Sequence, residues 1–140
     1  MESVGFTASI ASLLENAGLP TADLASSAPV KLYGARSNGT LVGVVGLELY
    51  GQAGLLRSLA VEPKKQKSGL GKALVESAES EARRAGVTHL YLLTATAEGY
   101  FSQLGYHMVQ RSEAPAAIAS TSQFSSLCPS SSAFMCKLLA

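Results

Sequence analysis

The sequence has little of what marks several large classes of protein. It contains only two cysteines, Cys128 and Cys136, and their spacing matches no common zinc-binding pattern. No apolar run reaches the roughly 18–20 residues that a membrane-spanning helix needs. The N-terminus shows no basic segment followed by an apolar one, which a signal peptide would have. We therefore expect reduced thiols, no metal site, no membrane contact and a cytoplasmic location.

Charged residues are also scarce. They make up 15% of the 140 residues, and the net charge is +1. A general nucleic-acid-binding surface needs an excess of positive charge over a wide face, so we expect no nucleic-acid partner. Hydrophobic residues make up 47% of the chain, which is enough for a real core. We expect residues 1–140 to form a single globular domain.

The basic residues gather around one stretch. Residues 55–61 are mostly apolar and predict a strand, which Pro63 ends because it has no N–H for a ladder. A helix then starts near Gly69, and the N–H groups at a helix N-terminus favour anions. Because Gly69 and Gly71 have no Cβ, phosphates can approach the backbone there. The stretch therefore predicts a site for a phosphate-bearing ligand. The lysines around it are Lys64, Lys65, Lys67 and Lys72.

Two common phosphate-binding motifs do not fit this loop. A Walker-type loop needs four residues between its first glycine and its Gly-Lys pair, and a Ser or Thr after the lysine. Here one residue separates Gly69 from Gly71, and Ala73 follows the lysine. A dinucleotide-binding fingerprint needs a third small residue where Leu74 stands. Both motifs are excluded.

The remaining pattern predicts a mixed sheet with helices. Apolar positions three to four apart predict helices over residues 7–17 and 69–85. Asn38-Gly39 predicts a type I′ turn between two strands, residues 30–35 and 41–50. A strand over 87–94 follows the second helix, so it should run parallel to strand 55–61. Weaker signals predict a first strand near 3–6, a short helix over 95–104, and strands over 106–111 and 133–139.

A segment rich in Ser and Ala, residues 112–132, separates the last two strands. Pro115 can open a short helix in it, and Ile118 and Phe124 are its apolar anchors. The segment is too long for a hairpin turn. Segments like this often cover a functional site, and the alternative is a surface excursion of no consequence.

Two motifs carry a resemblance to a known family. The first, Gln66-Lys67-Ser68-Gly69-Leu70-Gly71, resembles the acetyl-CoA pyrophosphate loop of the GNAT superfamily of N-acetyltransferases. The second, residues 101–106, resembles the superfamily's Tyr-x-x-Leu-Gly-Phe signature. The resemblance implies an α/β (α+β) fold whose mixed, mostly antiparallel sheet has six to seven strands with about four helices on its faces. It also implies acetyl-CoA as co-substrate, with strand 55–61 splaying from its parallel neighbour, residues 89–94, so that the gap admits the pantetheine arm. The implied cofactor-binding residues are Leu59, Ala60, Val61, Gln66, Lys67, Ser68, Gly69, Leu70, Gly71, Lys72 and Phe101.

Within this superfamily the chain is most similar to the short bacterial arsenic-resistance N-acetyltransferases. The similarity rests on residues 46–48, 55–61, 90–94 and 124–129. Those relatives acetylate the α-amine of amino-acid analogues such as phosphinothricin, methionine sulfoximine and arsinothricin, so the implied partner is a small-molecule amine. Many of the superfamily dimerise, which leaves a homodimer open. Two other functions also stay open: acetylation of a polyamine, drug or protein N-terminus, and acyl-CoA binding without catalysis.

Three polar residues are candidates for handling the acceptor amine. Glu48 lies in an otherwise apolar strand and is the candidate base, because attack requires a neutral amine. Its alternative is a solvent-facing glutamate. Arg57 suits an acceptor carboxylate, which a guanidinium binds bidentately; its alternative is a surface arginine paired with a nearby acid. Ser58 should face away from Arg57 by strand alternation and ranks lower. Phe124 is a further candidate acceptor contact.

The acid that protonates the departing CoA thiolate is harder to assign. The superfamily often uses a tyrosine, and Phe101 occupies the matching position. Tyr100 is its neighbour, but one residue along a helix turns a side chain by about 100°. Either Tyr100 acts as the acid or no side chain does. His89 and His107 are weak candidates.

Overall fold

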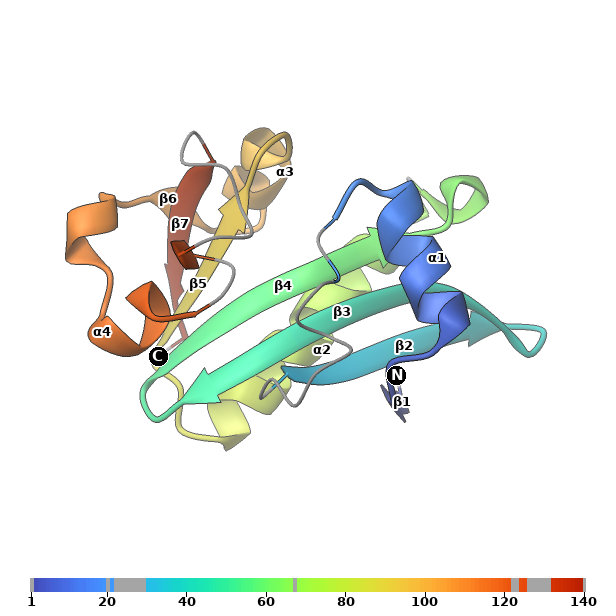
Figure 1. Cartoon of the computed structure of the whole chain (residues 1–140), viewed down its shortest axis with the longest axis horizontal. Coiled ribbons are helices and arrows are strands. Elements are labelled where there is room, and N and C mark those ends of the chain that lie inside the picture. Colours follow the sequence, from blue (N-terminus) through green and yellow to red (C-terminus); the bar gives the residue numbers. More distant parts are fainter. Residues whose placement is uncertain are drawn as a thin grey trace.

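A seven-stranded, mostly antiparallel sheet forms the centre of the fold (Figure 1). The computed structural model describes residues 2–19, 21, 30–66, 68–121, 124–125 and 132–139. The strand order is β1-β2-β3-β4-β5-β7-β6. The strands are β1 Glu2–Val4, β2 Val30–Ser37, β3 Thr40–Tyr50, β4 Ala53–Val61, β5 His89–Thr94, β6 His107–Met108 and β7 Ala133–Leu138. The helices are α1 Ala8–Asn16, α2 Leu70–Arg84, α3 Glu98–Gln103 and α4 Ala116–Ala119.

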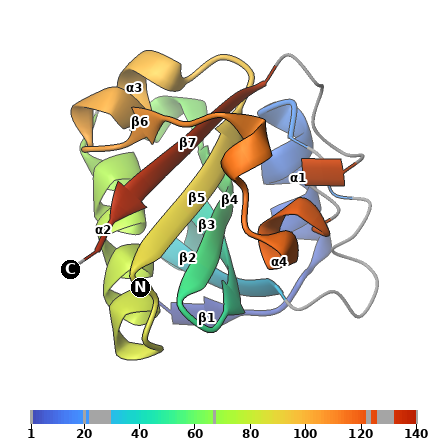
Figure 2. The ribbon, with the colours of Figure 1, turned by 90° about the vertical axis from the view of Figure 1, so that its left-hand side faces the viewer.

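The helices cover both faces of the sheet. Figure 2 shows α2 and α3 on one face and α1 and α4 on the other. Every strand pair is antiparallel except β4 with β5, which run parallel on either side of the α2 crossover. The predicted α/β (α+β) architecture is therefore confirmed. No described helix is long and apolar enough to cross a membrane.

Local signals in the sequence account for several boundaries. Thr7 caps α1 by accepting a hydrogen bond from the backbone N–H of Ile10 at 3.4 Å. Asn38 and Gly39 have φ values of 52° and 81°, as the predicted type I′ turn requires. Gly86 ends the α2 segment with φ 93°. The predicted turn at Asn38-Gly39 is therefore confirmed.

Three predicted details were wrong. The strand expected over residues 106–111 is only two residues long, because the chain turns into a 3-10 helix at Arg111–Glu113. The helix expected from residue 95 begins at Glu98. Ala73 is one of the apolar positions whose spacing predicted the helix over 69–85, but it is exposed, since the buried face of α2 runs through Val75 and Glu79.

The buried face of α2 carries a carboxylate that the sequence pattern did not reveal. Glu79 is only 3% exposed. Tyr106 donates its hydroxyl to Glu79 Oε2 at 2.8 Å, and Lys137 Nζ lies 3.0 Å from the same oxygen. Lys137 also donates to the backbone carbonyl of Leu104 at 2.9 Å. The cluster thus joins α2, β7 and the end of α3, with each buried polar group paired.

This cluster predicts a loss of stability in alkali. Burial first, and then the Glu79 carboxylate, raise the pKa of Tyr106 well above its usual 10.0. The folded protein therefore holds the phenol proton more tightly than the unfolded chain does. This contribution to stability is complete below about pH 10. Above that pH the free energy of unfolding should fall by about 1.4 kcal/mol per pH unit for this group.

Denaturant unfolding at pH 9, 10 and 11 measures the effect. Tyr106→Phe removes the titrating proton, so its stability should fall less steeply above pH 10 than that of the wild type. Equal slopes for the two proteins would contradict the assignment.

Candidate functional site

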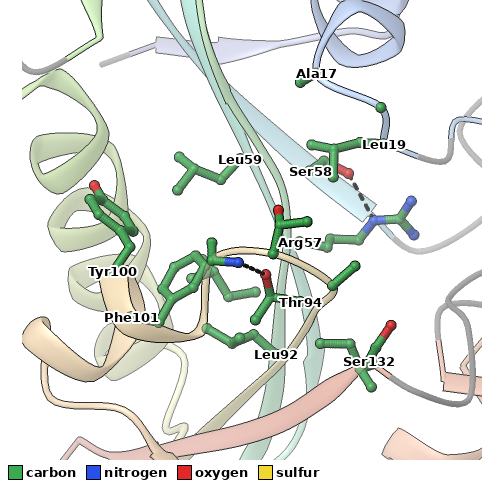
Figure 3. Close-up of a pocket in the computed structure, with 16 residues that line it drawn as sticks. Ala17, Leu19, Arg57, Ser58, Leu59, Leu92, Thr94, Tyr100, Phe101 and Ser132 are labelled. Carbon is green, nitrogen blue, oxygen red and sulfur yellow. Dashed lines mark hydrogen bonds between the residues drawn. The ribbon is translucent and has the colours of Figure 1, made fainter.

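The parallel strands β4 and β5 pair at one end and splay apart at the other. Their paired residues run from Ala53↔His89 to Leu55↔Tyr91 and, within the described residues, extend no further. Beyond that point a pocket of about 620 Å³ lies between them (Figure 3). The predicted splaying of these two strands is confirmed. The pocket is lined by the end of the α1 segment (Ala17, Gly18, Leu19), by β4 (Leu56, Arg57, Ser58, Leu59), by β5 and the following loop (Leu92, Leu93, Thr94, Ala95, Thr96, Ala97), and by Tyr100, Phe101 and Ser132.

A β-bulge opens β4 at this pocket. The register passes from Val44↔Ala60 to Gly46↔Arg57, so Ser58 and Leu59 together oppose a single residue of β3. Ser58 has φ 57°, a left-handed conformation that is uncommon for a residue other than glycine. Backbone strain of this kind is found most often at functional sites.

The bulge corrects the expected orientation of Ser58. Strict alternation placed its side chain on the face opposite Arg57, and that prediction was wrong. Arg57 Nε donates to Ser58 Oγ at 3.0 Å, and both residues line the pocket. The left-handed turn at Ser58 breaks the two-residue period and brings the hydroxyl round to the guanidinium.

Arg57 and Glu48, which were considered separately, form a buried ion pair. Arg57 Nη1 lies 2.9 Å from Glu48 Oε2, and the two side chains are 0% and 4% exposed. Tyr50 donates its hydroxyl to the other oxygen of Glu48. The alternatives, a solvent-facing glutamate and a surface arginine, both required an exposed side chain. Neither residue is exposed. Arg57 lines the pocket, whereas Glu48 lies outside its lining.

Substitutions at Ser58 can separate strain from hydrogen bonding. Ser58→Gly relieves the left-handed backbone but loses the bond from Arg57, whereas Ser58→Ala loses the bond and keeps the strain. The free energy of unfolding should be about 1 kcal/mol lower for the alanine variant than for the glycine variant. Ser58→Val should be the least stable of the three, because β-branching makes this conformation harder still. Chemical denaturation of the three variants measures this order, and equal stabilities would contradict it.

The loop after β4 folds back onto the open edge of that strand. Glu62 N–H donates to Val42 on β3 at 2.8 Å, so by alternation the backbone of Val61 points to the open side and that of Ala60 to β3. Gln66 Nε2 donates to the Val61 carbonyl at 3.3 Å. Gly69 then caps α2 with φ 87°. The N-terminus of this fifteen-residue helix, which favours anions, lies beside Val61 at the end of β4.

Tyr100 lies against the first turn of α2, directly after this loop. A Cβ added at Gly71 would lie 2.7 Å from the Tyr100 hydroxyl. The tyrosine is 41% exposed, and Figure 3 shows it beside α2. Burial of part of the ring raises the pKa of its hydroxyl. α2 and α3 therefore bring Gly71 and Tyr100 to the same end of the pocket.

Comparison with known proteins identifies the family. A sequence model described as the acetyltransferase (GNAT) family matches residues 9–106. The chain belongs to this family. The predicted GNAT fold, with its sheet and four helices, is therefore confirmed.

Individual relatives agree with this membership. An uncharacterized N-acetyltransferase of Chlorobaculum tepidum is 31% identical over 78 residues, which cover 55% of this chain and 50% of the relative. The chain thus spans about half the length of that relative. N-acetylglutamate synthase of Neisseria gonorrhoeae, solved with coenzyme A and N-acetyl-glutamate, superposes with a TM-score of 0.79 at 20% identity, covering 97% of this chain and 34% of that one. Tetrahymena GCN5 gives 0.76 at 15% identity, covering 94% and 85%.

The GNAT signature residue at position 101 differs in this chain. Phe101 is buried and packs edge-on against both Tyr100 and Tyr106, with ring centroids 5.3 and 5.7 Å away. It lines the pocket without offering a proton. The hydroxyl of Tyr100 lies at Gly71, so the one-residue shift places it toward the loop end of the gap.

The segment before β7 is anchored as predicted, but Phe124 lies away from the pocket lining. Ile118 is fully buried. Phe124 packs edge-on against Phe134 with centroids 5.2 Å apart, and the Arg111 guanidinium lies 5.1 Å from its ring centroid. The rest of the stretch compared above, residues 126–129, lies outside the described residues, and so does Lys67.

The two histidines do not contribute to the candidate site. His89 on β5 and His107 on the edge strand β6 are exposed, and neither lines the pocket. No group of three or more His, Cys, Asp or Glu residues gathers in the described part of the chain. The absence of a metal site remains a prediction.

The geometry fits acetyl-CoA, which the family binds. The gap between β4 and β5 can admit a narrow arm, and the backbone of Val61 faces it. Gly69 is exposed and has open space where a Cβ would stand, which permits close approach at the helix N-terminus. Ser68 and Lys72 are exposed beside it, and Leu70 is half-buried.

Proposed function

We propose that this chain is an acetyl-CoA-dependent N-acetyltransferase that acts on the α-amine of a small amino acid or a toxic amino-acid analogue. Phosphinothricin, methionine sulfoximine and arsinothricin are the analogues in question. One observation carries the choice of acceptor: the pocket between the parted strands has the buried cation of Arg57 in its wall. A guanidinium has five N–H groups in a planar fork, so it can hold Glu48 and an acceptor carboxylate together.

The cofactor side of the site uses backbone groups. Acetyl-CoA supplies an acetyl group activated as a thioester. Leu59, Ala60 and Val61 are the proposed contacts to its pantetheine arm, and Val61 has its backbone on the open side. An N–H in the bulge can polarise the thioester carbonyl, and loss of one such donor typically costs about 10²–10³ in rate. Gln66 to Gly71, with Lys72, would hold the pyrophosphate.

Glu48 is the proposed proton acceptor for the attacking amine, and its contacts set a condition on that role. Both carboxylate oxygens already accept hydrogen bonds, from Tyr50 and from Arg57. A proton from the pocket therefore reaches Glu48 through water or after a change in these contacts. The same contacts support a second role, in which Glu48 orients Arg57 toward the acceptor.

Tyr100 is the proposed acid for the departing thiol, and its position supports an alternative. Its hydroxyl lies beside Gly71, where the loop would bind phosphate. A contact with the cofactor's phosphates would explain that position without proton transfer. Phe101 cannot donate a proton, so an acyl-CoA-binding domain without turnover remains the second candidate function.

The pocket lining argues against a polyamine acceptor. No Asp or Glu belongs to the described lining, whereas a site for a polycation should present acids. An acceptor with a carboxylate matches the charge of Arg57 better.

Release of free CoA thiol from acetyl-CoA tests the proposal, with phosphinothricin, methionine sulfoximine, spermidine and a short peptide as separate acceptors. Turnover with the first two alone supports an amino-acid acceptor. Turnover only with spermidine or the peptide overturns the choice of acceptor. Bound acetyl-CoA without turnover on any of them favours the non-catalytic alternative.

A further inference from the structure

We infer that the hydroxyl of Ser132 binds the acceptor molecule by donating a hydrogen bond to an anionic oxygen, such as a carboxylate or phosphinate oxygen. This inference rests on the proposed function and adds to it a residue that recognises the acceptor. The starting observation is a buried polar atom without a partner. Among the described residues, no group hydrogen-bonds to Ser132 Oγ, although the residue is only 6% exposed.

An unpaired buried hydroxyl is unfavourable, so its place needs a reason. Ser132 lines the pocket between β4 and β5. It directly precedes β7, whose first residue, Ala133, pairs with Thr94 at the end of β5. The hydroxyl is thus held at the rim of the sheet, where a molecule in the pocket can supply the missing partner.

Ser132 lies at the end of the pocket that suits the acceptor. Figure 3 shows Tyr100 beside α2 on one side, and Ser132 and the Arg57 guanidinium on the other. The side near α2 belongs to the phosphate-binding loop. The acceptor therefore takes the side that carries Arg57, whose positive charge favours an anionic oxygen over an ammonium group. A hydroxyl facing such an oxygen acts as a donor.

The backbone of Ser132 is held by Arg111. Arg111 Nη2 donates to the Ser132 carbonyl at 3.2 Å, and its guanidinium also packs against the ring of Phe124. Arg111 and Phe124 are therefore positioning residues for Ser132. This assigns Phe124 a role in the acceptor site although it does not line the pocket.

The test compares Ser132→Ala, Ser132→Thr and wild type in two measurements. The first is steady-state turnover with phosphinothricin, giving separate KM values for acceptor and acetyl-CoA. Loss of a hydrogen bond to a charged group should raise the acceptor KM about tenfold in Ser132→Ala. The KM for acetyl-CoA should stay unchanged, and Ser132→Thr, which keeps a hydroxyl, should recover most of the loss.

The second measurement is the Tm of each protein with and without phosphinothricin. Removing an unpaired buried hydroxyl should leave the Tm of Ser132→Ala equal to or above that of wild type without ligand. The rise in Tm caused by phosphinothricin should be smaller in that variant. Ser120→Ala is the matched control, because Ser120 is exposed and its hydroxyl donates to Ala116 at 2.8 Å. It should change neither KM.

If the wild-type protein turns over phosphinothricin, either of two results would overturn the inference. An unchanged acceptor KM in Ser132→Ala would show that the hydroxyl does not bind the acceptor. A lower Tm without ligand would show that the hydroxyl has a structural partner. Failure of the proposed function looks different, because the wild-type protein would then turn over no amino-acid acceptor; that result overturns the inference as well.

Discussion

Replacing Glu48 by glutamine is expected to lower the free energy of unfolding by about 3–5 kcal/mol. The reason is the cation left behind. Arg57 is fully buried, and Glu48 is the carboxylate that lies 2.9 Å from its guanidinium. Glutamine preserves the size of the side chain and an accepting oxygen but not the charge. Urea or guanidinium unfolding of the variant at neutral pH measures the loss.

A double variant provides the control. Glu48→Leu combined with Arg57→Met removes both charges and keeps much of the volume. Replacing a buried ion pair in this way is often neutral or stabilising, so the double variant should be more stable than Glu48→Gln. A loss below about 1 kcal/mol in Glu48→Gln, the range of an exposed pair, would contradict the buried pairing.

Steady-state kinetics of Glu48→Gln separate the two roles proposed for Glu48. If Glu48 accepts the proton, Glu48→Gln should lower kcat and alter the acidic limb of the pH profile. If it orients Arg57, the acceptor KM should rise while the acidic limb is retained. Normal kcat and normal KM would remove Glu48 from the site.

Replacing Gly71 by valine is expected to raise the KM for acetyl-CoA about a hundredfold. A Cβ at position 71 would lie 2.7 Å from the Tyr100 hydroxyl, so a valine there crowds the first turn of α2, where the phosphates are proposed to bind. Loss of two charge-assisted hydrogen bonds from the backbone to phosphate accounts for this magnitude. The acceptor KM should change little. Initial rates at varied acetyl-CoA concentration measure the effect.

The Tyr100 side chain allows the cause to be checked. In Gly71→Val combined with Tyr100→Ala, the side chain that the valine meets is gone. If the valine blocks the phosphates, the KM for acetyl-CoA stays high in the double variant. Recovery to the value of Tyr100→Ala alone would show that the valine acts by displacing Tyr100.

The features that the sequence predicted well depend on local chemistry. The turn at Asn38-Gly39 needs positive φ at both residues, and Asn and Gly are the residue types that adopt this conformation most readily. Pro63 predicts the end of the strand before Gly69, Gly69 and Gly71 predict the loop, and apolar residues three to four apart predict the helix. The parting of β4 and β5 was inferred from resemblance to the family, and the register confirms it.

The features that were missed depend on how distant segments meet. A strand pattern cannot show that Ser58 is left-handed, because the bulge is defined by its register with β3. The pairing of Glu48 with Arg57 follows from Gly46↔Arg57, which puts Glu48 two residues along on the same face. A correct prediction of the register between β3 and β4 would have revealed this ion pair. The Glu79 cluster likewise needs Lys137, which is 58 residues away.

Transfer of label from acetyl-CoA to an amino-acid acceptor tests the central claim most directly. The protein is incubated with phosphinothricin and acetyl-CoA that carries carbon-13 in its acetyl group, and the acceptor is then examined by mass spectrometry. The account predicts labelled N-acetylphosphinothricin from the wild-type protein, and much less of it from Arg57→Ala at a low acceptor concentration. Acetyl-CoA consumed with its label in free acetate, or equal product from both proteins, would contradict it.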